Sequence, residues 1–453
     1  MKYLIIVSVL FFLSCKKQDA WLDKKSNKAD VVPVTIADFQ AILDNDEIMN
    51  ADYPSLGLIG SDNYYIPFFR WQALQPTERN AYVWKPDIYE GDIGVDWNYP
   101  YQKVEYANIA MDGISKINSD INNQSALNQV KGSALFYRAY SFYNLAQLYA
   151  KPYNSMTAST DPGIVLRLHS DVNEPSVRAS IEQTYNRIIG DLLEAKQLLP
   201  VTPSIKTRPS QKSVLALLAR VSLAMEDYKK AEEYASEALQ LQSELIDFNS
   251  LNPAASFPLP TFQTDNKEVL FYSTSLNYFT LLLIRTDTIL YRSYQPNDLR
   301  RTIFFKVRGV DWFAFKSDYT GAFASKFSGL AINELYLIRA ESFARQNKVT
   351  EAMKDLNTLL INRWKTGTFI PYTAINADDA LSQILTERRK ELPFTGNLPW
   401  EDLRRLNKDP RFARTLTRLL NGQIFTLPPN DKRYVYPIPD NEIRLSGIAQ
   451  NPR

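Results

Sequence analysis

The sequence holds very little of the chemistry that cysteine and histidine supply. Its 453 residues include one cysteine, Cys15, and one histidine, His169. A single cysteine excludes an intramolecular disulfide and a cysteine-based zinc site, and a single histidine excludes a site with two histidine ligands. A Ser-His-Asp triad would have to use His169 as its base. That residue follows an Asp-Pro-Gly turn, so an ordinary loop position is the simpler interpretation.

An excess of basic charge is also absent. Lys and Arg total 52, Asp and Glu total 50, and the net charge is +2. Proteins that bind nucleic acid usually show a clear basic excess or stripe, so no nucleic-acid partner is expected. Hydrophobic residues make up 45% and charged residues 23% of the chain, which is typical of a globular protein. The length allows one large helical domain or two to three ordinary ones.

Long hydrophobic runs are absent except at the N-terminus. Met1-Lys2 precedes an apolar run from Leu4 to Leu13 that only Ser8 interrupts. This run is shorter than the roughly 20 residues that a bilayer-spanning helix needs. A charged start and a run of this length predict a signal peptide over residues 1–14. The run closes on Ser14-Cys15 and is similar to a bacterial lipobox, although Phe12 stands where Leu is commonest.

Cys15 is therefore the predicted site of lipid attachment, and the membrane is an expected partner through that anchor. Residues 15–27, which begin Cys-Lys-Lys-Gln-Asp, are predicted to form a flexible tether. Stable anchoring needs more than one acyl chain, and bacterial lipoproteins carry several. The alternatives are an ordinary secretory signal with a chance cysteine, or a buried apolar segment.

Hydrophobic periodicity predicts a mainly all-α fold. The predicted helical stretches are 97–118, 127–148 and 181–199, followed by helical hairpins over 211–241 and 332–363. Two long regions between them, Asp44–Asp96 and Leu251–Gly329, lack this periodicity, and the second holds short β-like runs over 268–273 and 302–307. Irregular regions of this length are uncommon unless they are functional.

The two predicted hairpins align with each other at a separation of 121 residues. The aligned positions are Ala219, Ser222, Tyr228, Ala231, Ala235 and Ala238 with Ala340, Phe343, Val349, Ala352, Leu356 and Leu359. Small residues at fixed places let antiparallel helices pack closely, as in tetratricopeptide units. Stretches 127–148 and 181–199 would form a third unit, split by a Pro-rich insertion, and 97–118 would begin a fourth. The fold expected is a tetratricopeptide-like helical scaffold with long loops and a few short strands; generic helix pairs are the alternative.

Five stretches resemble motifs of a known family when their order and spacing are taken together. They are Trp21–Lys25, Trp97–Asn108, Gly132–Tyr140, Asn333–Glu341, and a C-terminal set made of Glu387–Leu392, Trp400–Arg405, Tyr436–Pro439 with Glu442-Ile443, and Gln450–Pro452. The C-terminal set holds Glu-Arg-Arg, Trp-x-Asp-Leu-Arg-Arg, Pro-Ile-Pro and Gln-Asn-Pro. On these motifs the chain resembles the SusD/RagB nutrient-uptake lipoproteins of the Bacteroidetes outer membrane.

The chain departs from that family pattern at two places. Residues 393–399 lack the Glu of the family's Phe-x-Glu-Gly-x-Arg, and the usual Gly-Tyr does not follow Arg453. The charged motif residues Arg388, Arg389, Glu391, Asp402 and Arg404 are interpreted as a network that pins the C-terminal segment to the helices. They are expected to hold the fold rather than to bind a ligand.

The resemblance implies a binding protein at the cell outer membrane, facing outward, and neither an enzyme nor a cofactor protein. Family members act as a lid over a SusC-like TonB-dependent transporter. They deliver to it an oligosaccharide or polysaccharide, or in some branches a peptide. The chain would then divide into an N-terminal part over 28–250, with hairpins and an aromatic loop, and a C-terminal part over 251–453, with binding loops and a hairpin.

Candidate ligand-binding residues follow from loop position and residue type. Exposed Trp and Tyr rings can stack on the apolar C–H faces of sugars, and polar neighbours can bond to hydroxyl groups. The candidate rings are Tyr64, Tyr65, Trp71, Trp84, Tyr89, Trp312 and Tyr319, and the candidate polar partners are Asp62, Asn63, Arg70, Asp311 and Asp318. The alternative role of each ring is packing. Binding and packing are equally favoured for Trp71 and Trp312, and packing is favoured over binding for the other rings. Trp97 is expected in the core.

Two other classes of function stay open from sequence. A glycoside hydrolase would use paired carboxylates, but no segment presents an obvious catalytic motif. A helical-repeat adaptor would bind only proteins. The lipid anchor and the aromatic loops argue against this class. Calcium has no spaced Asp cluster to support it, and no metal or cofactor is expected.

The lipid anchor is directly testable. Substituting Cys15→Ala should move the protein from the membrane fraction to the soluble fraction, since no other segment is long and apolar enough to hold it there. Fractionation followed by immunoblotting measures the change. A variant that stays membrane-bound and surface-exposed would show that Cys15 is not the anchor.

Overall fold

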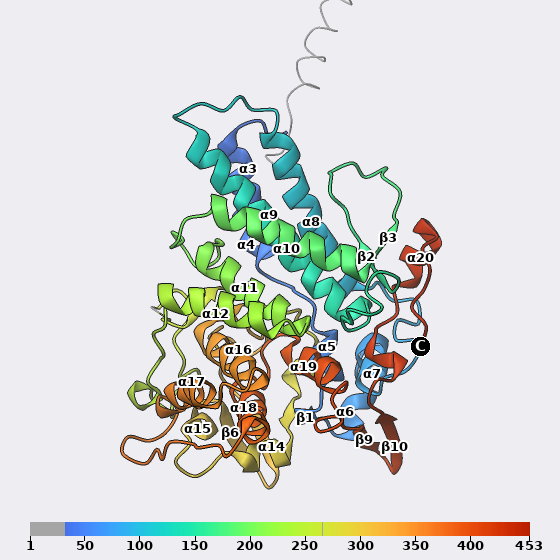
Figure 1. The fold of residues 1–453 in the computed structure, drawn as a ribbon. Coiled ribbons are helices and arrows are strands. Elements are labelled where there is room, and N and C mark those ends of the chain that lie inside the picture. Colours follow the sequence, from blue (N-terminus) through green and yellow to red (C-terminus); the bar gives the residue numbers. More distant parts are fainter. Residues whose placement is uncertain (1–31, 265) are drawn as a thin grey trace, which may run out of the picture.

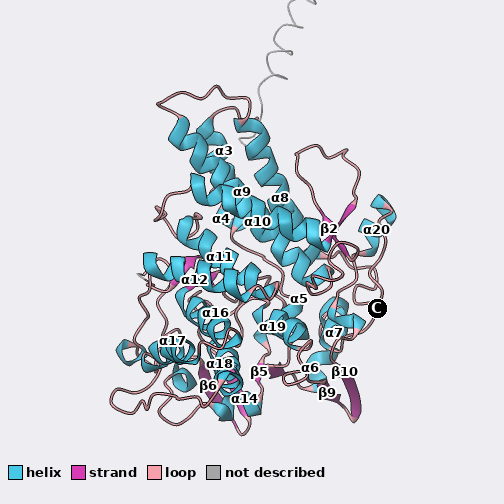
Figure 2. Cartoon of the chain, in the orientation of Figure 1, coloured by secondary structure: helices cyan, strands magenta, loops and turns pink. Residues whose placement is uncertain are grey.

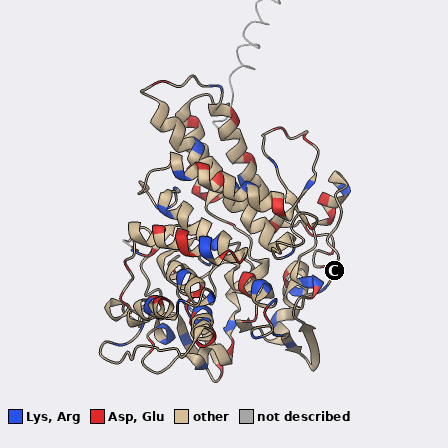
Figure 3. Cartoon of the chain, in the orientation of Figure 1, with Lys and Arg blue, Asp and Glu red and all other residues tan. Residues whose placement is uncertain are grey.

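The computed structural model describes residues 32–264 and 266–453 (Figure 1). The predicted signal peptide, Cys15 and the tether lie outside these residues. Within them the fold is mainly α-helical, as predicted, with a few short strands (Figure 2). Acidic and basic side chains are interspersed over the helices (Figure 3), in keeping with the small net charge. In the described part, no helix has both the length and the apolar character that crossing a bilayer requires.

A stack of consecutive helices forms the scaffold, and each packs on the one before it. These helices are α8 (Val95–Ile114), α9 (Gln124–Tyr149), α10 (Ile181–Leu198), α11 (Gln211–Ala224), α12 (Tyr228–Leu241), α16 (Ile332–Arg345), α17 (Val349–Ile361) and α18 (Ala377–Glu391), the last of which packs mainly on α16. The predicted stretches and both hairpins are confirmed to within a few residues.

Local signals set where these helices begin. Ser180 caps α10 and Ser210 caps α11. In each case the serine side chain accepts from the backbone N–H of the third helical residue, and the side chain of that residue accepts from the serine backbone N–H, which defines a capping box. The two hairpins turn through residues with positive φ, Glu226 and Asn347, which carry the same 121-residue separation as the helical positions. Ala231 and Ala352 are fully buried where the helices of each hairpin cross. The repeat predicted from sequence is therefore present in the backbone.

The two long regions between predicted helices are built of short elements rather than being irregular throughout. The first holds α4 (Asp46–Met49), α5 (Leu56–Gly60), β1 (Tyr64–Tyr65), α6 (Phe68–Gln72) and α7 (Pro76–Tyr82), after α3 (Ile36–Leu43). The second holds β4 (Val269–Phe271), α13 (Phe279–Leu282), β5 (Arg285–Thr286), α14 (Thr288–Ser293), α15 (Arg300–Ile303), β6 (Phe305–Gly309) and β7 (Trp312–Phe315). Thr302, expected in a strand, lies in α15, and the strand starts at Phe305.

Every described strand pairs with one other strand, antiparallel. The pairs are β1 with β5, β2 (Pro162–Val165) with β3 (Arg178–Ser180), β4 with β8 (Leu330–Ala331), β6 with β7, and β9 (Leu416–Leu420) with β10 (Gln423–Leu427). The pairing of β1 with β5 joins the first long region to the second, more than 200 residues later. The chain ends with α19 (Leu398–Leu406) and α20 (Asp440–Ser446).

Arginines of the family-like motifs tie neighbouring helices together. Arg138 of α9 makes a bidentate pair with Asp191 of α10, with both N–O distances 2.8 Å. Arg339 of α16 does the same with Asp355 of α17, at 2.6 and 2.7 Å. Both arginines stand in an Arg-Ala dipeptide, so this motif serves to fix one helix against the next.

The predicted C-terminal charge network is confirmed for Arg388, Glu391 and Asp402 but not for Arg389, which turns toward Asp62, or for Arg404. Arg388 donates to Asp402 at 2.8 Å, and Glu391 accepts from the buried Arg300 and Arg363 at 3.2 and 2.9 Å. Arg404 pairs with no carboxylate of the described residues; its guanidinium donates to the carbonyls of Gln147 and Ala150 at the end of α9. The C-terminal segment is thus pinned to the helices both by ion pairs and by a helix cap.

The buried ion pairs of Arg363 lead to a prediction about stability. Arg363 is fully buried between Glu268 and Glu391. Arg363→Met would leave the buried Glu268 carboxylate without its cation and Glu391 with Arg300 alone. We expect a loss of about 3–5 kcal/mol in the free energy of unfolding, measured by urea titration. The matched control, Lys230→Met, removes the exposed pair with Glu233 and should leave the free energy of unfolding almost unchanged, because solvent screens that pair. Equal losses in the two variants would show that the network does not hold the fold.

Candidate functional site

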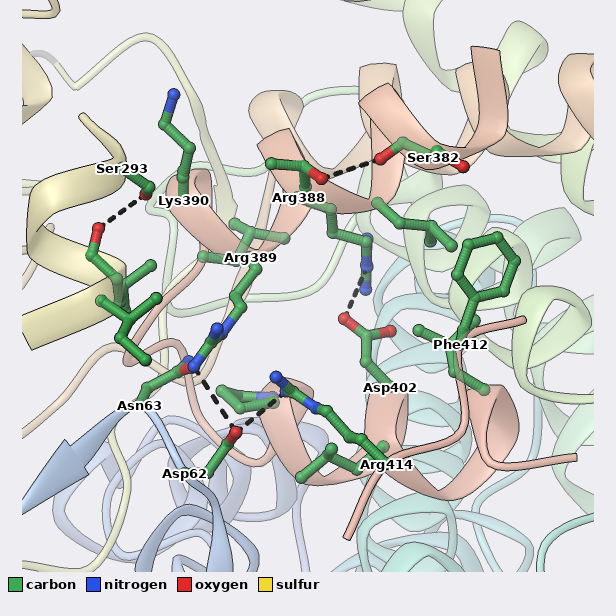
Figure 4. Close-up of a pocket in the computed structure, with 18 of the residues that line it drawn as sticks. Asp62, Asn63, Ser293, Ser382, Arg388, Arg389, Lys390, Asp402, Phe412 and Arg414 are labelled. Carbon is green, nitrogen blue, oxygen red and sulfur yellow. Dashed lines mark hydrogen bonds and ion pairs between the residues drawn. The ribbon is translucent and has the colours of Figure 1, made fainter. Parts of the chain in front are cut away.

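A cleft of about 560 Å³ opens between α18, α19 and the loop after α5. The close-up in Figure 4 shows Arg388 directed at Asp402, while Arg389 and Arg414 converge on Asp62. The Arg389 Nε donates to the Asn63 side chain at 2.7 Å, and an Arg414 nitrogen donates to Asp62 at 3.0 Å. The predicted residues Asp62 and Asn63 therefore lie in the wall of this cleft.

A second cavity of about 510 Å³ continues from the first. The two share Asp62, Ile289, Arg389 and Arg414, and the second extends past Tyr65 to β9. We call the two cavities together the groove. Ile289, which lines both cavities together with Arg389 and Arg414, is 75% exposed and adds an apolar side chain to the groove.

Tyr65 connects the groove to Trp312 through strand pairing. β1 pairs Tyr65 with Arg285 of β5, and the Arg285 guanidinium lies 4.4 Å from the centroid of the Trp312 ring. The Tyr65 hydroxyl donates to the Asp311 carbonyl at 2.6 Å, and the Asp311 carboxylate pairs with Arg292 at 2.7 Å. We call Tyr65, Asp311, Trp312 and Arg285 the aromatic rim.

Local geometry exposes the Trp312 ring. Asp311 has φ of 53° in the turn of the β6–β7 hairpin, a left-handed conformation that Asp tolerates better than most residues. The turn leaves Trp312 at the start of β7 with 39% of its surface exposed. One ring face is covered by Arg285, a cation–π contact that holds the ring in place.

Four of the predicted rings are buried, which favours packing as their role, although Tyr64 also lines the second cavity of the groove. Tyr64, Trp84 and Tyr89 are each 1% exposed, and Tyr319 is 7% exposed. Their polar atoms bond inside the protein to the Ile59 carbonyl, the Gly60 carbonyl, the Tyr149 hydroxyl and Glu268, respectively. Burial raises the pKa of Tyr89 and Tyr319, so both stay neutral hydroxyls. Trp97 is in the core, as expected.

Trp71 and Arg70 lie on α6, apart from the aromatic rim. The Trp71 ring packs on Phe68 and on Phe425 of β10, and its Nε1 donates to the Arg79 carbonyl at 3.0 Å. Arg70 is exposed and lies over the Phe69 ring. Asp318 bonds to backbone nitrogens of its own loop, at Thr320 and Phe327. These residues do not join the groove.

Sequence reasoning missed the two arginines that define the groove. Arg389 was grouped with Arg388 as structural, yet consecutive helical residues point about 100° apart. That spacing sends Arg388 toward Asp402 and Arg389 into the groove. Arg414 carried no sequence signal, because it reaches Asp62 from a loop 352 residues later in the chain.

Guanidinium groups neighbour the carboxylates of the groove. Burial opposes the ionisation of Asp402, but the guanidiniums of Arg388 and Arg405 outweigh it and lower its pKa. Asp62 forms ion pairs with Arg389 and Arg414. A carboxylic acid that donates a proton needs a raised pKa, so Asp402 is not suited to that role. The described residues contain no group of acidic, His or Cys side chains that could hold a metal.

Two family models match most of the chain. Residues 20–223 match the family described as "Starch-binding associating with outer membrane", and residues 332–453 match the "SusD family". A curated relative, "SusD-like protein P2" of Formosa agariphila, is 30% identical over 184 residues, which are 39% of this chain and 34% of that protein. The match therefore spans about a third of that relative's length.

Solved structures share the fold at low identity. A SusD superfamily protein from Bacteroides thetaiotaomicron has a TM-score of 0.72 at 20% identity, over 93% of this chain and 100% of the other. A SusD-like carbohydrate binding protein from Bacteroides vulgatus has a TM-score of 0.67 at 19% identity, over 91% and 96%.

The contrast between buried and exposed rings gives a stability test. Trp84→Ala should cost about 3–5 kcal/mol in the free energy of unfolding, because it empties a buried, hydrogen-bonded site. Trp312→Ala should cost less than about 1 kcal/mol, since its ring is partly in water. Urea titration of both variants measures the difference. An equally large loss for Trp312→Ala would assign that ring to packing.

Proposed function

We propose, since this chain belongs to the SusD/RagB family, that it is a glycan-capturing lipoprotein of the outer membrane. It binds an oligosaccharide or polysaccharide in the groove and passes it to a SusC-like TonB-dependent transporter. The observation that carries this proposal is that Tyr65, which lines the second lobe of the groove, bonds to the backbone carbonyl of Asp311 beside Trp312, so the aromatic rim adjoins the groove. A long, partly open groove suits an extended chain of sugar rings better than a compact metabolite.

The groove offers the two kinds of contact that sugars use. The exposed side of Trp312 and the Tyr65 ring give surfaces for the apolar faces of sugar rings. Arg389 and Arg414 each carry five N–H donors, of which only some are used by Asp62, Asn63 and Asp287. The remaining donors can bond to sugar hydroxyls, and charge-assisted bonds of this kind are stronger than neutral ones.

Binding rather than catalysis fits the groove. A glycoside hydrolase needs one carboxylic acid that can donate a proton and a second carboxylate across the sugar bond. The groove carboxylates Asp62, Asp287 and Asp402 each form an ion pair with a guanidinium, and the pKa of Asp402 is lowered by Arg388 and Arg405 despite its burial.

Delivery to a transporter requires a place at the outer membrane. Cys15 would supply it through its lipid, with residues 15–27 as the tether. The family model matching residues 20–223 describes proteins that associate with the outer membrane, which supports this location. Co-expression with a SusC-like transporter and co-purification through a tag on either partner would test the association.

Binding can be tested with the full-length protein on a panel of glycans and peptides. Trp312→Ala should weaken binding of the glycan found by about tenfold or more, measured by titration calorimetry. The matched control is Phe257→Ala, a ring with the same 39% exposure that belongs neither to the groove nor to the aromatic rim; it should leave affinity unchanged.

The same panel separates the alternatives. Binding of peptides alone would place the chain with a peptide-capturing branch. New reducing ends after incubation with a glycan would show hydrolysis and overturn the proposal. Glycan binding that Trp312→Ala leaves intact would place the ligand elsewhere, with Trp71 as the next ring to replace.

A further inference from the structure

A cleft of about 730 Å³ lies on the other side of α19 from the groove. Its walls come from the segment after α9, from the end of α19 and from the last residues of the chain, Ala449–Pro452. Asn407 lines both this cleft and the first lobe of the groove, so the two sites lie back to back. We call it the C-terminal cleft.

Positive charge in this cleft lacks counter-ions. Among the described residues, the guanidiniums of Arg178 and Arg404 form no ion pair, and neither does the ammonium of Lys432. Arg178 donates to the carbonyls of Gly163 and Ala449 at 2.8 and 3.0 Å. Arg404 donates to the carbonyls of Gln147 and Ala150. Every oxygen that these two guanidiniums reach is therefore neutral.

The two carboxylates in the wall are already neutralised by other cations. Asp161 pairs with Lys151 at 2.6 Å, and Asp431 pairs with Arg433 at 2.8 Å. The C-terminal end of α9, which Arg404 caps, contributes only about half a negative charge. Two guanidiniums and one ammonium face this half charge and the nearby Glu401 carboxylate, which acts on Arg404, so the cleft keeps a net positive charge.

Buried donors without acceptors point to the same conclusion. Arg404 is 2% exposed, and its Nε has no hydrogen-bond partner among the described residues. Burial lowers the pKa of Arg404 to about 10, a shift that a bound anion would reverse. The surrounding surface includes Pro152, Tyr434 and Pro452, which suits a ligand with an apolar body and one charged group.

We propose that the C-terminal cleft binds a carboxylate-bearing small molecule, separately from the glycan groove. A planar carboxylate matches the fork of an arginine and can take two parallel N–H bonds. The volume lies within the range of small-molecule sites, enough for one or two rings. The carboxylate can belong to an acidic sugar or to a free organic acid, since the charged group is the same in both.

Titration calorimetry of the full-length protein tests the proposal with three probes: a galacturonic acid disaccharide, citrate and the neutral galactose disaccharide. We expect at least one of the two acids to bind, more weakly at high salt, and the neutral disaccharide not to bind in this cleft. Binding of the disaccharide acid alone would identify an acidic sugar, and binding of citrate alone a free organic acid.

Lys432→Glu provides the test variant, because this exposed side chain makes no hydrogen bond or ion pair with the described residues. It should weaken acid binding by about tenfold or more. Arg404→Lys, which keeps the charge but loses the fork, should weaken it too; Lys432→Glu keeps the test open if loss of the α9 cap prevents folding. The matched control is Lys116→Glu, the same change of charge just after the C-terminal end of α8 and outside the cleft lining, which should bind normally.

Two results would overturn the proposal. One is that neither acid binds. The other is that Lys432→Glu and Lys116→Glu bind acid equally well, which would place any binding outside this cleft.

Discussion

The structure depends on how the charged end of α18 is neutralised. The last five residues of this helix are Glu387, Arg388, Arg389, Lys390 and Glu391. Glu387 and Glu391 lie in the interior, where Arg300 bonds to both and Arg363 bonds to Glu391. Glu268, Asp298 and the buried Lys390, which pairs with Asp298 and Glu387, complete the network. A single unpaired charge there would be costly, so the helix end is allowed only one orientation.

That orientation places the groove. With Glu387 and Glu391 fixed inward, the helical period turns Arg389 outward, where it meets Asp62 and Asn63. Arg388 is directed at Asp402 of α19 and so sets the opposite wall. The same network reaches the second long region through Glu268 and Tyr319. The charged residues that hold the fold and the arginine that lines the candidate binding surface therefore lie on adjacent faces of the same helical turn.

The C-terminal segment has a comparable double role. Arg404, Asn451 and the backbone nitrogen of Tyr436 bond to the last carbonyls of α9. These bonds satisfy groups that a buried helix end would otherwise leave unpaired. They also hold in place the residues that enclose the C-terminal cleft. The Pro-Ile-Pro and Gln-Asn-Pro signature is thus explained as a helix cap, with no direct part in the groove.

The sequence by itself determined the helices, the 121-residue repeat and the pinning of the C-terminus, because periodicity, capping and salt-bridge chemistry are local or repeat at fixed spacing. It could not decide which rings meet solvent. Tyr64 and Tyr65 are neighbours of one type, yet strand geometry buries the first and leaves the second beside Trp312. Trp84 and Trp312 both lie in predicted loops, and only the packing of distant segments separates them. Arg414 reaches Asp62 for the same reason. Exposure is a property of the whole packed chain, so only the tertiary structure could assign it.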